Sequence, residues 1–401
     1  MNSQNLSFRM NKIRFLLYVC FTTLFFCFMD LHANDSMNPQ KECKKKNHDT
    51  NNSKSQPDKK NNAPLKKDKA PSGLSFFPII GYSPENSLML GVSLVYLYRL
   101  SDNSSTLSNI QPIAIYTLKN QYLVYLLSEF YWANDFHKIK SEISLSHMPE
   151  TFYGIGNNMQ ESQKEDYDRN FFAGSISYQP RIWKKLRLGL GFDFEYSEVY
   201  NFKPSGILDT QNLTGEGVGF SSGFGIIANW DSRNHPFAPT TGGFYEFSAY
   251  FYNQAFGSDY DYNRYTFDIR RYFSIAPKHT IAVHSYMKIN QGNVPFYRLA
   301  LLGGPFIMRG IYEGRYRDKN QLSFQLDYRF MPIVWRFGMT AFVAVGDVAN
   351  KVTDFKIGDF KTTGGVGFRF NLDKQNNVYM RIDLAMSEEG LSPYLLFHEA
   401  F

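Results

Sequence analysis

Several stretches of this chain alternate strictly between apolar residues and polar or glycine residues. In Leu186–Tyr196 every even-numbered residue is apolar and every odd-numbered one is polar or glycine, and Leu322–Phe330 repeats the pattern. Because successive side chains of a β-strand point to opposite faces, each such strand has one apolar and one polar face. Charged residues on the polar face are costly in a soluble sandwich but typical of a barrel with a wet interior. The sequence therefore predicts an all-β fold, a transmembrane antiparallel β-barrel of the outer-membrane type.

Composition and hydropathy agree with such strands. The chain of 401 residues is 43% hydrophobic and 17% aromatic, yet its mean hydropathy is −0.36, as expected when apolar and polar faces alternate. After residue 30 no stretch is long and uncharged enough to cross a membrane as a helix. A membrane protein without spanning helices must form a closed barrel, because every backbone polar group in lipid needs a partner.

The N-terminal residues have the features of an export signal. Met10–Arg14 is basic, Phe15–Met29 is apolar and about as long as the core of a signal peptide, and Leu31–Ala33 offers a peptidase site. We therefore predict a signal peptide at residues 1–33. Together with the strand pattern, it predicts a location in the bacterial cell outer membrane.

Residues 34–72 are rich in Lys, Asn and Pro and have almost no large apolar side chain, which predicts a disordered linker. The linker is either a plain spacer or a basic arm toward anionic lipid or a periplasmic partner. The net charge of +6 is mild and much of the lysine lies in this tract, so no nucleic-acid partner is expected. Cys43 is alone outside the signal peptide, which excludes a disulfide scaffold.

Residues 73–401 are predicted to form the barrel. Dividing this region at its Gly, Asn, Asp, Pro and Ser clusters gives about 16 strands, an even number that returns both ends of the barrel to the periplasmic side. The expected spans are 74–82, 87–100, 107–118, 120–133, 136–149, 167–181, 184–198, 215–230, 242–255, 260–275, 277–291, 319–332, 335–348, 360–372, 376–387 and 392–401.

The longest connection, Gly292–Asp318, follows the eleventh strand and is expected on the outer side of the membrane. It is rich in glycine, so it can lie over the barrel mouth or fold into the lumen. In the second case Arg309 would be offered to inward-facing carboxylates. Gly310, next to it, permits backbone angles that other residues would strain against.

At this connection the chain resembles the BamA/TamA superfamily, which includes proteins described as bacterial surface antigens. The similarity lies in short motifs whose order and spacing extend over most of residues 73–401. The motif residues are Leu301–Gly310, Asp327-Tyr328-Arg329, Asp231-Ser232-Arg233 with Pro239 and Gly242, Phe342 with Gly346, Gly365–Arg369 and Glu399-Ala400-Phe401.

The resemblance implies that Arg309 enters the barrel and pairs with acidic residues on neighbouring strands, which holds the connection in place. Where the family has an acidic residue after Phe342, this chain has Ala344, and Asp347 comes beyond Gly346. The alternation makes Asp327 and Asp383 inward-facing candidates, since carboxylates and guanidinium groups form bidentate pairs. The full set of candidates for holding the loop is Arg309, Gly310, Asp327, Arg329, Asp347 and Asp383.

The resemblance also implies a role in inserting or translocating other proteins or lipids, with outer-membrane lipid and a client outer-membrane or exported protein as partners. The family's periplasmic POTRA modules, which receive clients by strand addition, have no counterpart among the predicted elements, so a separate periplasmic partner is expected. A weak seam between the first and last strands would serve this role. Phe397, Glu399 and Phe401 are the seam and C-terminal signal residues, Glu399 standing where an apolar residue is usual.

Two other functions remain open at this point. The barrel could be a passive pore or a structural barrel whose lumen is closed by the long connection. An outer-membrane hydrolase is disfavoured, because the eight His residues are scattered and the neighbours His284 and Ser285 point to opposite faces of one strand. We therefore expect no enzyme activity, no cofactor and no metal site.

Overall fold

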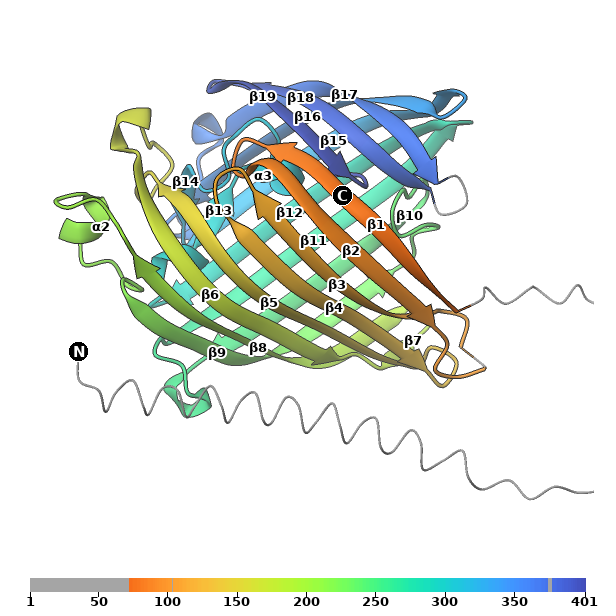
Figure 1. Cartoon of the computed structure of the whole chain (residues 1–401), viewed down its shortest axis with the longest axis horizontal. Helices are drawn as coiled ribbons and strands as arrows, with labels where there is room; N and C mark the ends of the chain where they lie inside the picture. The colour runs from red at the N-terminus through yellow and green to blue at the C-terminus, as the bar shows by residue number, and fades with distance from the viewer. Residues whose placement is uncertain (1–71, 103, 374–376) are drawn as a thin grey trace, which may run out of the picture. The chain divides into compact units, whose positions relative to one another are not determined.

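The described part of the chain forms one closed antiparallel β-barrel (Figure 1). The computed structural model describes residues 72–102, 104–373 and 377–401. The predicted signal peptide and the predicted linker up to residue 71 lie outside these ranges. The barrel has 16 long strands, which confirms the predicted fold class. A further short strand, β7, continues β6, and both pair with β8.

The long strands follow one another around the barrel in chain order, each antiparallel to its neighbours. Their bounds agree with the expected spans to within a few residues. The strands of the barrel are β1 Gly73–Ser83, β2 Ser87–Tyr98, β3 Ser108–Thr117, β4 Tyr122–Trp132, β5 His137–Phe152, β6 Glu165–Tyr178, β7 Arg181–Trp183, β8 Leu186–Tyr200, β9 Val218–Asp231, β10 Gly242–Tyr252, β11 Tyr262–Ala276, β12 His279–Gly292, β15 Asn320–Val334, β16 Phe337–Ala349, β17 Lys361–Asp373, β18 Val378–Ser387 and β19 Gly390–Phe397.

The remaining elements are short and lie in connections. No helix in the described ranges is long and apolar enough to cross a membrane. These elements are η2 Glu161–Gln163, α2 Ile207–Thr210, η3 Gln254–Phe256, η4 Phe296–Arg298, β13 Ala300–Leu302, α3 Gly304–Ile307, β14 Tyr316–Asp318, η5 Val352–Asp354 and η6 Ile357–Asp359.

The alternation seen in the sequence separates an outer from an inner surface. On β15, Phe324, Leu326 and Tyr328 are exposed, whereas Gln325 and Asp327 between them are buried. The exposed apolar side chains cover the outside of the barrel, where they contact lipid in an outer-membrane protein. Charged and amide side chains are left to fill the lumen.

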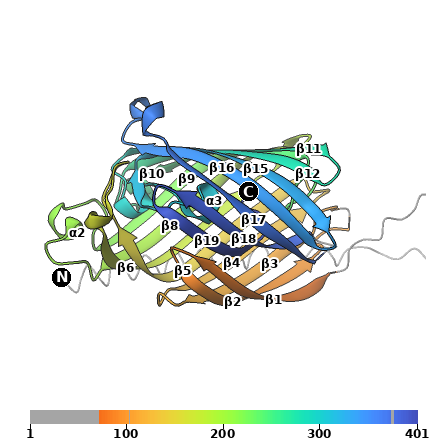
Figure 2. The ribbon, with the colours of Figure 1, turned by 90° about the horizontal axis from the view of Figure 1, so that it is seen from above.

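The two ends of the barrel differ in their connections (Figures 1 and 2). At the turn end, β1 begins, β19 ends and mostly short turns join the strands, such as the two residues between β11 and β12. At the loop end the connections include α2 and the segment between β12 and β15. In outer-membrane barrels the short turns face the periplasm and the long loops face outward.

Strands β1 and β19 close the barrel through a contact that we call the seam. Its register consists of one pair, Tyr82 opposite Leu395. By contrast, β1 pairs with β2 along its whole length, from Gly73 to Ser83. The seam is therefore the weakest junction in the wall, and among the described residues most of the seam-side edge of β1 has no paired strand residue.

The end of the chain departs from the prediction that the last strand extends to residue 401. Strand β19 ends at Phe397, which pairs with Met380 of β18. His398 then has a φ of +62°, a left-handed conformation that turns the backbone out of the strand direction. Glu399 and Phe401 are buried in the lumen and do not extend the seam strand.

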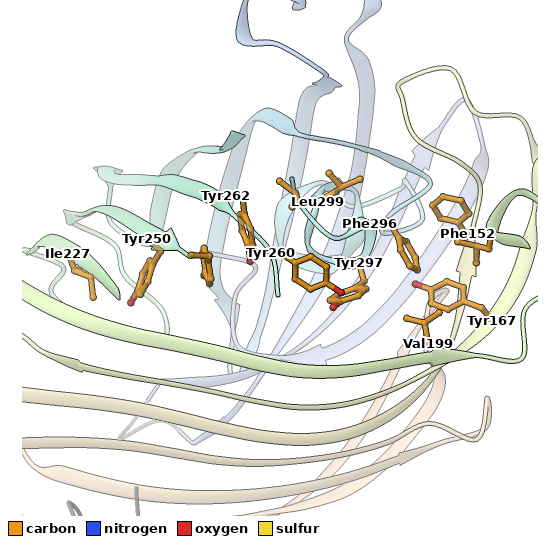
Figure 3. Close-up of a cluster of buried hydrophobic side chains, with 13 residues drawn as sticks. Phe152, Tyr167, Val199, Ile227, Tyr250, Tyr260, Tyr262, Phe296, Tyr297 and Leu299 are labelled. Atoms are coloured by element: carbon orange, nitrogen blue, oxygen red, sulfur yellow. The ribbon is translucent and has the colours of Figure 1, made fainter. Parts of the chain in front are cut away.

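A cluster of buried apolar side chains joins the β12–β15 connection to the strands β5, β6 and β8–β11 inside the barrel (Figure 3). Phe296 of η4 is 1% exposed and packs edge-on against Phe152 and Tyr167, with ring centroids 5.4 and 5.5 Å away. Burying one such aromatic side chain stabilises the fold by about 1.5–3 kcal/mol. The cluster therefore holds the β12–β15 connection against β5 and β6.

We expect the folded protein to be heat-modifiable. A closed barrel resists detergent, because opening it exposes unpaired strand edges. The unboiled protein should migrate differently from the boiled protein on a denaturing gel. Identical migration, together with recovery in the soluble periplasmic fraction, would contradict the barrel.

Candidate functional site

The candidate site is the connection between β12 and β15, residues 293–319, which we call the lumen loop. It contains η4, α3 and the two-stranded pair β13–β14. Both views place α3 inside the ring of strands (Figures 1 and 2). The connection therefore folds into the lumen.

Arg309 of the lumen loop lies between two strands of the wall. Its Nη2 is 2.5 Å from Oδ1 of Asp327 on β15, and its Nη1 is 2.9 Å from Oδ2 of Asp383 on β18. The guanidinium also lies 3.6 Å from the ring centroid of Phe342 on β16, which adds a cation–π contact. All three charged side chains are 0% exposed. The loop is thus joined to the wall by a fully buried ionic contact.

Three further arginines surround the same carboxylates. Asp383 also pairs with Arg369 at 2.6 Å and with Arg381 at 2.8 Å, and Arg329 lies 3.2 Å from Asp327. We call Arg309, Arg329, Arg369, Arg381, Asp327, Asp383 and Glu399 the ionic cluster. Removing one member of such a buried group leaves charges without partners, which costs several kcal/mol.

The C-terminal residues of the chain belong to this cluster. Both carboxylate oxygens of Glu399 accept hydrogen bonds from Nε of Arg369, at 2.9 and 3.0 Å. The carbonyl oxygen of Phe401 accepts a hydrogen bond from Arg329 at 3.1 Å. The sequence placed Glu399 among the seam and C-terminal signal residues, at a position where an apolar residue is usual. Instead its charge is used inside the lumen, which explains why no apolar residue stands at this position.

Gly310 connects the lumen loop to the strands on the β19 side of the seam. Its N–H donates to the hydroxyl of Tyr394 on β19 at 2.9 Å, and its carbonyl accepts from Ser387 at 2.7 Å. Its φ is +104°, and a Cβ there would lie 3.3 Å from the side chains of Thr363 and Ala385. Both the backbone angle and the close packing favour glycine at this position.

Asp347 lies elsewhere. Its carboxylate is 3.5 Å from the side-chain amide of Asn157, and it forms no ion pair with Arg309 among the described residues. The structure thus gives Arg309 the partners Asp327 and Asp383, and a role for Asp347 in holding the loop stays a prediction.

A second arginine of the lumen loop is anchored on another part of the wall. Nη2 of Arg298 lies 2.8 Å from Oδ1 of Asp193, and its Nε lies 3.4 Å from Glu195. Nη1 of Arg298 donates to the hydroxyl of Tyr262 at 3.1 Å. Asp193 and Glu195 are on β8, the seventh long strand, whereas Asp383 is on the fifteenth. The loop thus crosses the lumen between two ionic anchors.

The lumen loop also touches the turns on both sides of the seam. The N–H of Glu313 donates to Glu85, in the β1–β2 turn, at 3.1 Å. The N–H of Tyr312 donates to Glu389, in the β18–β19 turn, at 3.2 Å. Two adjacent residues of the lumen loop therefore contact both the β1–β2 hairpin and the β18–β19 hairpin, which meet at the seam.

Sequence reasoning did not identify Arg298, Glu85 or Glu389. Asp193 and Glu195 were visible as polar residues of an alternating strand, and Arg298 lies in the same connection as Arg309. No spacing rule, however, tells which loop residue meets which strand across a lumen. Glu85 and Glu389 have no sequence signal beyond their places in turns.

The described residues contain no group of three or more His, Cys, Asp or Glu arranged to hold a metal ion. His284 contacts Asp268 at 3.1 Å and the side chain of Gln325 at 3.1 Å. Ser285 follows it in β12, where its side chain points to the other face of the strand.

The family model for the Omp85 superfamily domain matches residues 113–383. The fold is similar to BamA from Haemophilus ducreyi lacking POTRA domains 1–3, with a TM-score of 0.57, 13% identity, and coverage of 82% of this chain and 70% of that one. No curated protein sequence matches the chain.

Two further solved structures are similar. CdiB from Escherichia coli has a TM-score of 0.55 and 9% identity, with 82% of this chain and 67% of that one covered. CdiB from Acinetobacter baumannii has a TM-score of 0.54 and 8% identity, with 81% of this chain but only 59% of that one covered. At such identities the similarity shows the fold alone.

Proposed function

Because the chain belongs to the Omp85 superfamily and is an outer-membrane β-barrel, we propose that it assists the insertion or translocation of other proteins or lipids at the outer membrane. The resemblance to BamA/TamA barrels seen in the sequence is confirmed by the family match and by the fold. The expected client is an outer-membrane or exported protein, and the surrounding partner is outer-membrane lipid.

The observation that carries this proposal is the seam. One registered pair, Tyr82 with Leu395, closes a barrel whose other strands pair along most of their length. Separating β1 from β19 therefore breaks few hydrogen bonds. It exposes two strand edges that can pair with an incoming strand.

The lumen loop would set how readily the seam opens. Its contacts with Glu85 and Glu389 reach both hairpins of the seam, and Arg309 and Arg298 hold it in the lumen. Movement of the lumen loop would then release the contacts with the two seam hairpins and open the lumen at the same time. A client or a separate periplasmic partner is proposed to provide the driving interaction.

The alternative function is a passive or structural barrel with a closed lumen. Pro78 in β1 and Pro393 in β19 lack an N–H, and proline at a strand edge limits pairing with other chains. The apolar cluster and the lumen loop also occupy part of the interior. These features favour a barrel that stays shut.

Vesicles containing the purified full chain distinguish these functions. If the barrel assists insertion, an unfolded outer-membrane protein added to them should become folded and protease-protected faster than with empty vesicles. Steady ion conductance without faster folding would favour a passive pore and contradict the proposal. If neither faster folding nor ion conductance is observed, the result would favour a structural barrel.

A further inference from the structure

All four tryptophans of the chain lie at the turn end of the barrel. Trp132 is the last residue of β4, Trp183 is the last of β7, Trp230 is next to last in β9, and Trp335 directly follows β15. Tryptophan prefers the boundary between the hydrocarbon and the headgroups. Its confinement to one end indicates that the two boundaries of this barrel have different chemistry.

Exposed lysines accompany these tryptophans on the β6–β8 turn. Lys184 lies over the ring of Trp183, 4.5 Å from its centroid, and Trp183 lies beside Trp230 with centroids 6.0 Å apart. Lys185 follows and is also exposed. We call Trp183, Lys184, Lys185 and Trp230 the turn-end patch.

The charges of this patch are not neutralised by the protein. In the described ranges neither Lys184 nor Lys185 has a carboxylate within ion-pair distance. The nearby acids are occupied, since Asp135 accepts hydrogen bonds from Thr106, and Asp231 pairs with Arg233 at 2.8 Å. By contrast with these two lysines, every arginine of the ionic cluster lies within 4.0 Å of a carboxylate.

The patch borders the lipid-facing surface of the barrel. On β8, which follows Lys185, Leu188 and Leu190 are exposed on the outside, Leu190 at 69%. Trp183 itself is 58% exposed. Lys184 and Lys185 therefore lie at the boundary of the exposed apolar surface of the barrel. In a membrane this boundary is at the depth of the lipid phosphates.

We propose that the turn-end patch binds the headgroup of an anionic phospholipid in the periplasmic leaflet. The tryptophan rings would lie against the upper acyl chains and glycerol, and the two ammonium groups would pair with the phosphate and the headgroup charge. A lipid fits better than an acidic peptide, because the charges adjoin an exposed apolar wall. The inference does not depend on the proposed insertion role.

Native mass spectrometry of the detergent-purified full chain tests this proposal. Titration with dioleoylphosphatidylglycerol should give more bound lipid than titration with zwitterionic dioleoylphosphatidylethanolamine. A lysine near an anionic lipid surface contributes roughly a fivefold gain in binding. The Lys184→Gln/Lys185→Gln variant should therefore weaken phosphatidylglycerol binding by roughly tenfold or more, while Lys184→Arg/Lys185→Arg retains it.

The matched control is Lys351→Gln/Lys356→Gln, which removes two exposed lysines of the β16–β17 connection at the loop end. This variant should bind phosphatidylglycerol like the wild type. Equal loss in both double variants, or equal binding of the two lipids, would overturn the proposal. Displacement of the lipid by equimolar inorganic phosphate or polyglutamate would also overturn it, by assigning the patch to a free anion or to an acidic peptide. A heat-modifiability gel checks that every variant is folded.

Discussion

The Arg298→Ala/Arg309→Ala double variant is expected to expose the lumen loop to an external protease far more than either single variant does. Each arginine joins the loop to buried carboxylates, Asp193 in one case and Asp383 in the other. Removing one partner of a buried pair costs about 3–5 kcal/mol. In Arg309→Ala, Asp383 keeps Arg369 and Arg381 as partners, so we expect the cost to lie at the lower end of this range. This cost shifts the opening equilibrium of the loop by roughly a hundredfold.

The two anchors share no partner and lie on distant strands, so their effects should be additive. The double variant would then open by about the product of the two single effects. Cleavage within residues 293–319 of protein in intact cells measures this opening. If the double variant is cut no faster than Arg309→Ala, Arg298 is not an anchor.

Asp383→Asn supplies the internal control. Because it removes a direct partner of Arg309, its effect should not add fully to that of Arg309→Ala. Full additivity of these two changes would mean that the buried contact does not hold the loop. Each variant must still show the heat-dependent shift, which separates loop release from loss of the barrel.

A disulfide across the seam is expected to abolish insertion or translocation activity, and reduction is expected to restore it. Tyr82 and Leu395 are directly opposite, and opposite Cα atoms of antiparallel strands are about 4.5–5.5 Å apart, within the range of a disulfide. The variant is Tyr82→Cys/Leu395→Cys with Cys43→Ser, which removes the native thiol outside the predicted signal peptide.

The control crosslink joins β1 to β2 through Phe76→Cys/Leu94→Cys, a registered pair away from the seam. It places the same bond in the wall without restraining β19, so it should leave activity intact. A passive or structural barrel needs no opening at the seam. Unchanged client folding in the oxidised Tyr82–Leu395 variant would therefore exclude lateral opening as the mechanism.

The sequence by itself determined the barrel, its strand number and the face that each strand turns to lipid. These are local properties, since alternation of residue type gives the face and turn-forming residues give the boundaries. The same reasoning identified Asp327 and Asp383 as inward-facing and Gly292–Asp318 as the unusual connection. The structure places Arg309 beside both of these carboxylates.

Only the tertiary structure decided which groups meet inside the lumen. Asp383 and Asp327 reach one arginine from strands that are not neighbours, and Arg298 crosses to β8, because strand tilt and closure set these distances. Glu399 enters the ionic cluster through one left-handed residue, His398, a turn that no alternation pattern records. The single-pair seam likewise depends on how the first and last strands meet when the sheet closes, which is a property of the whole barrel and of no local segment.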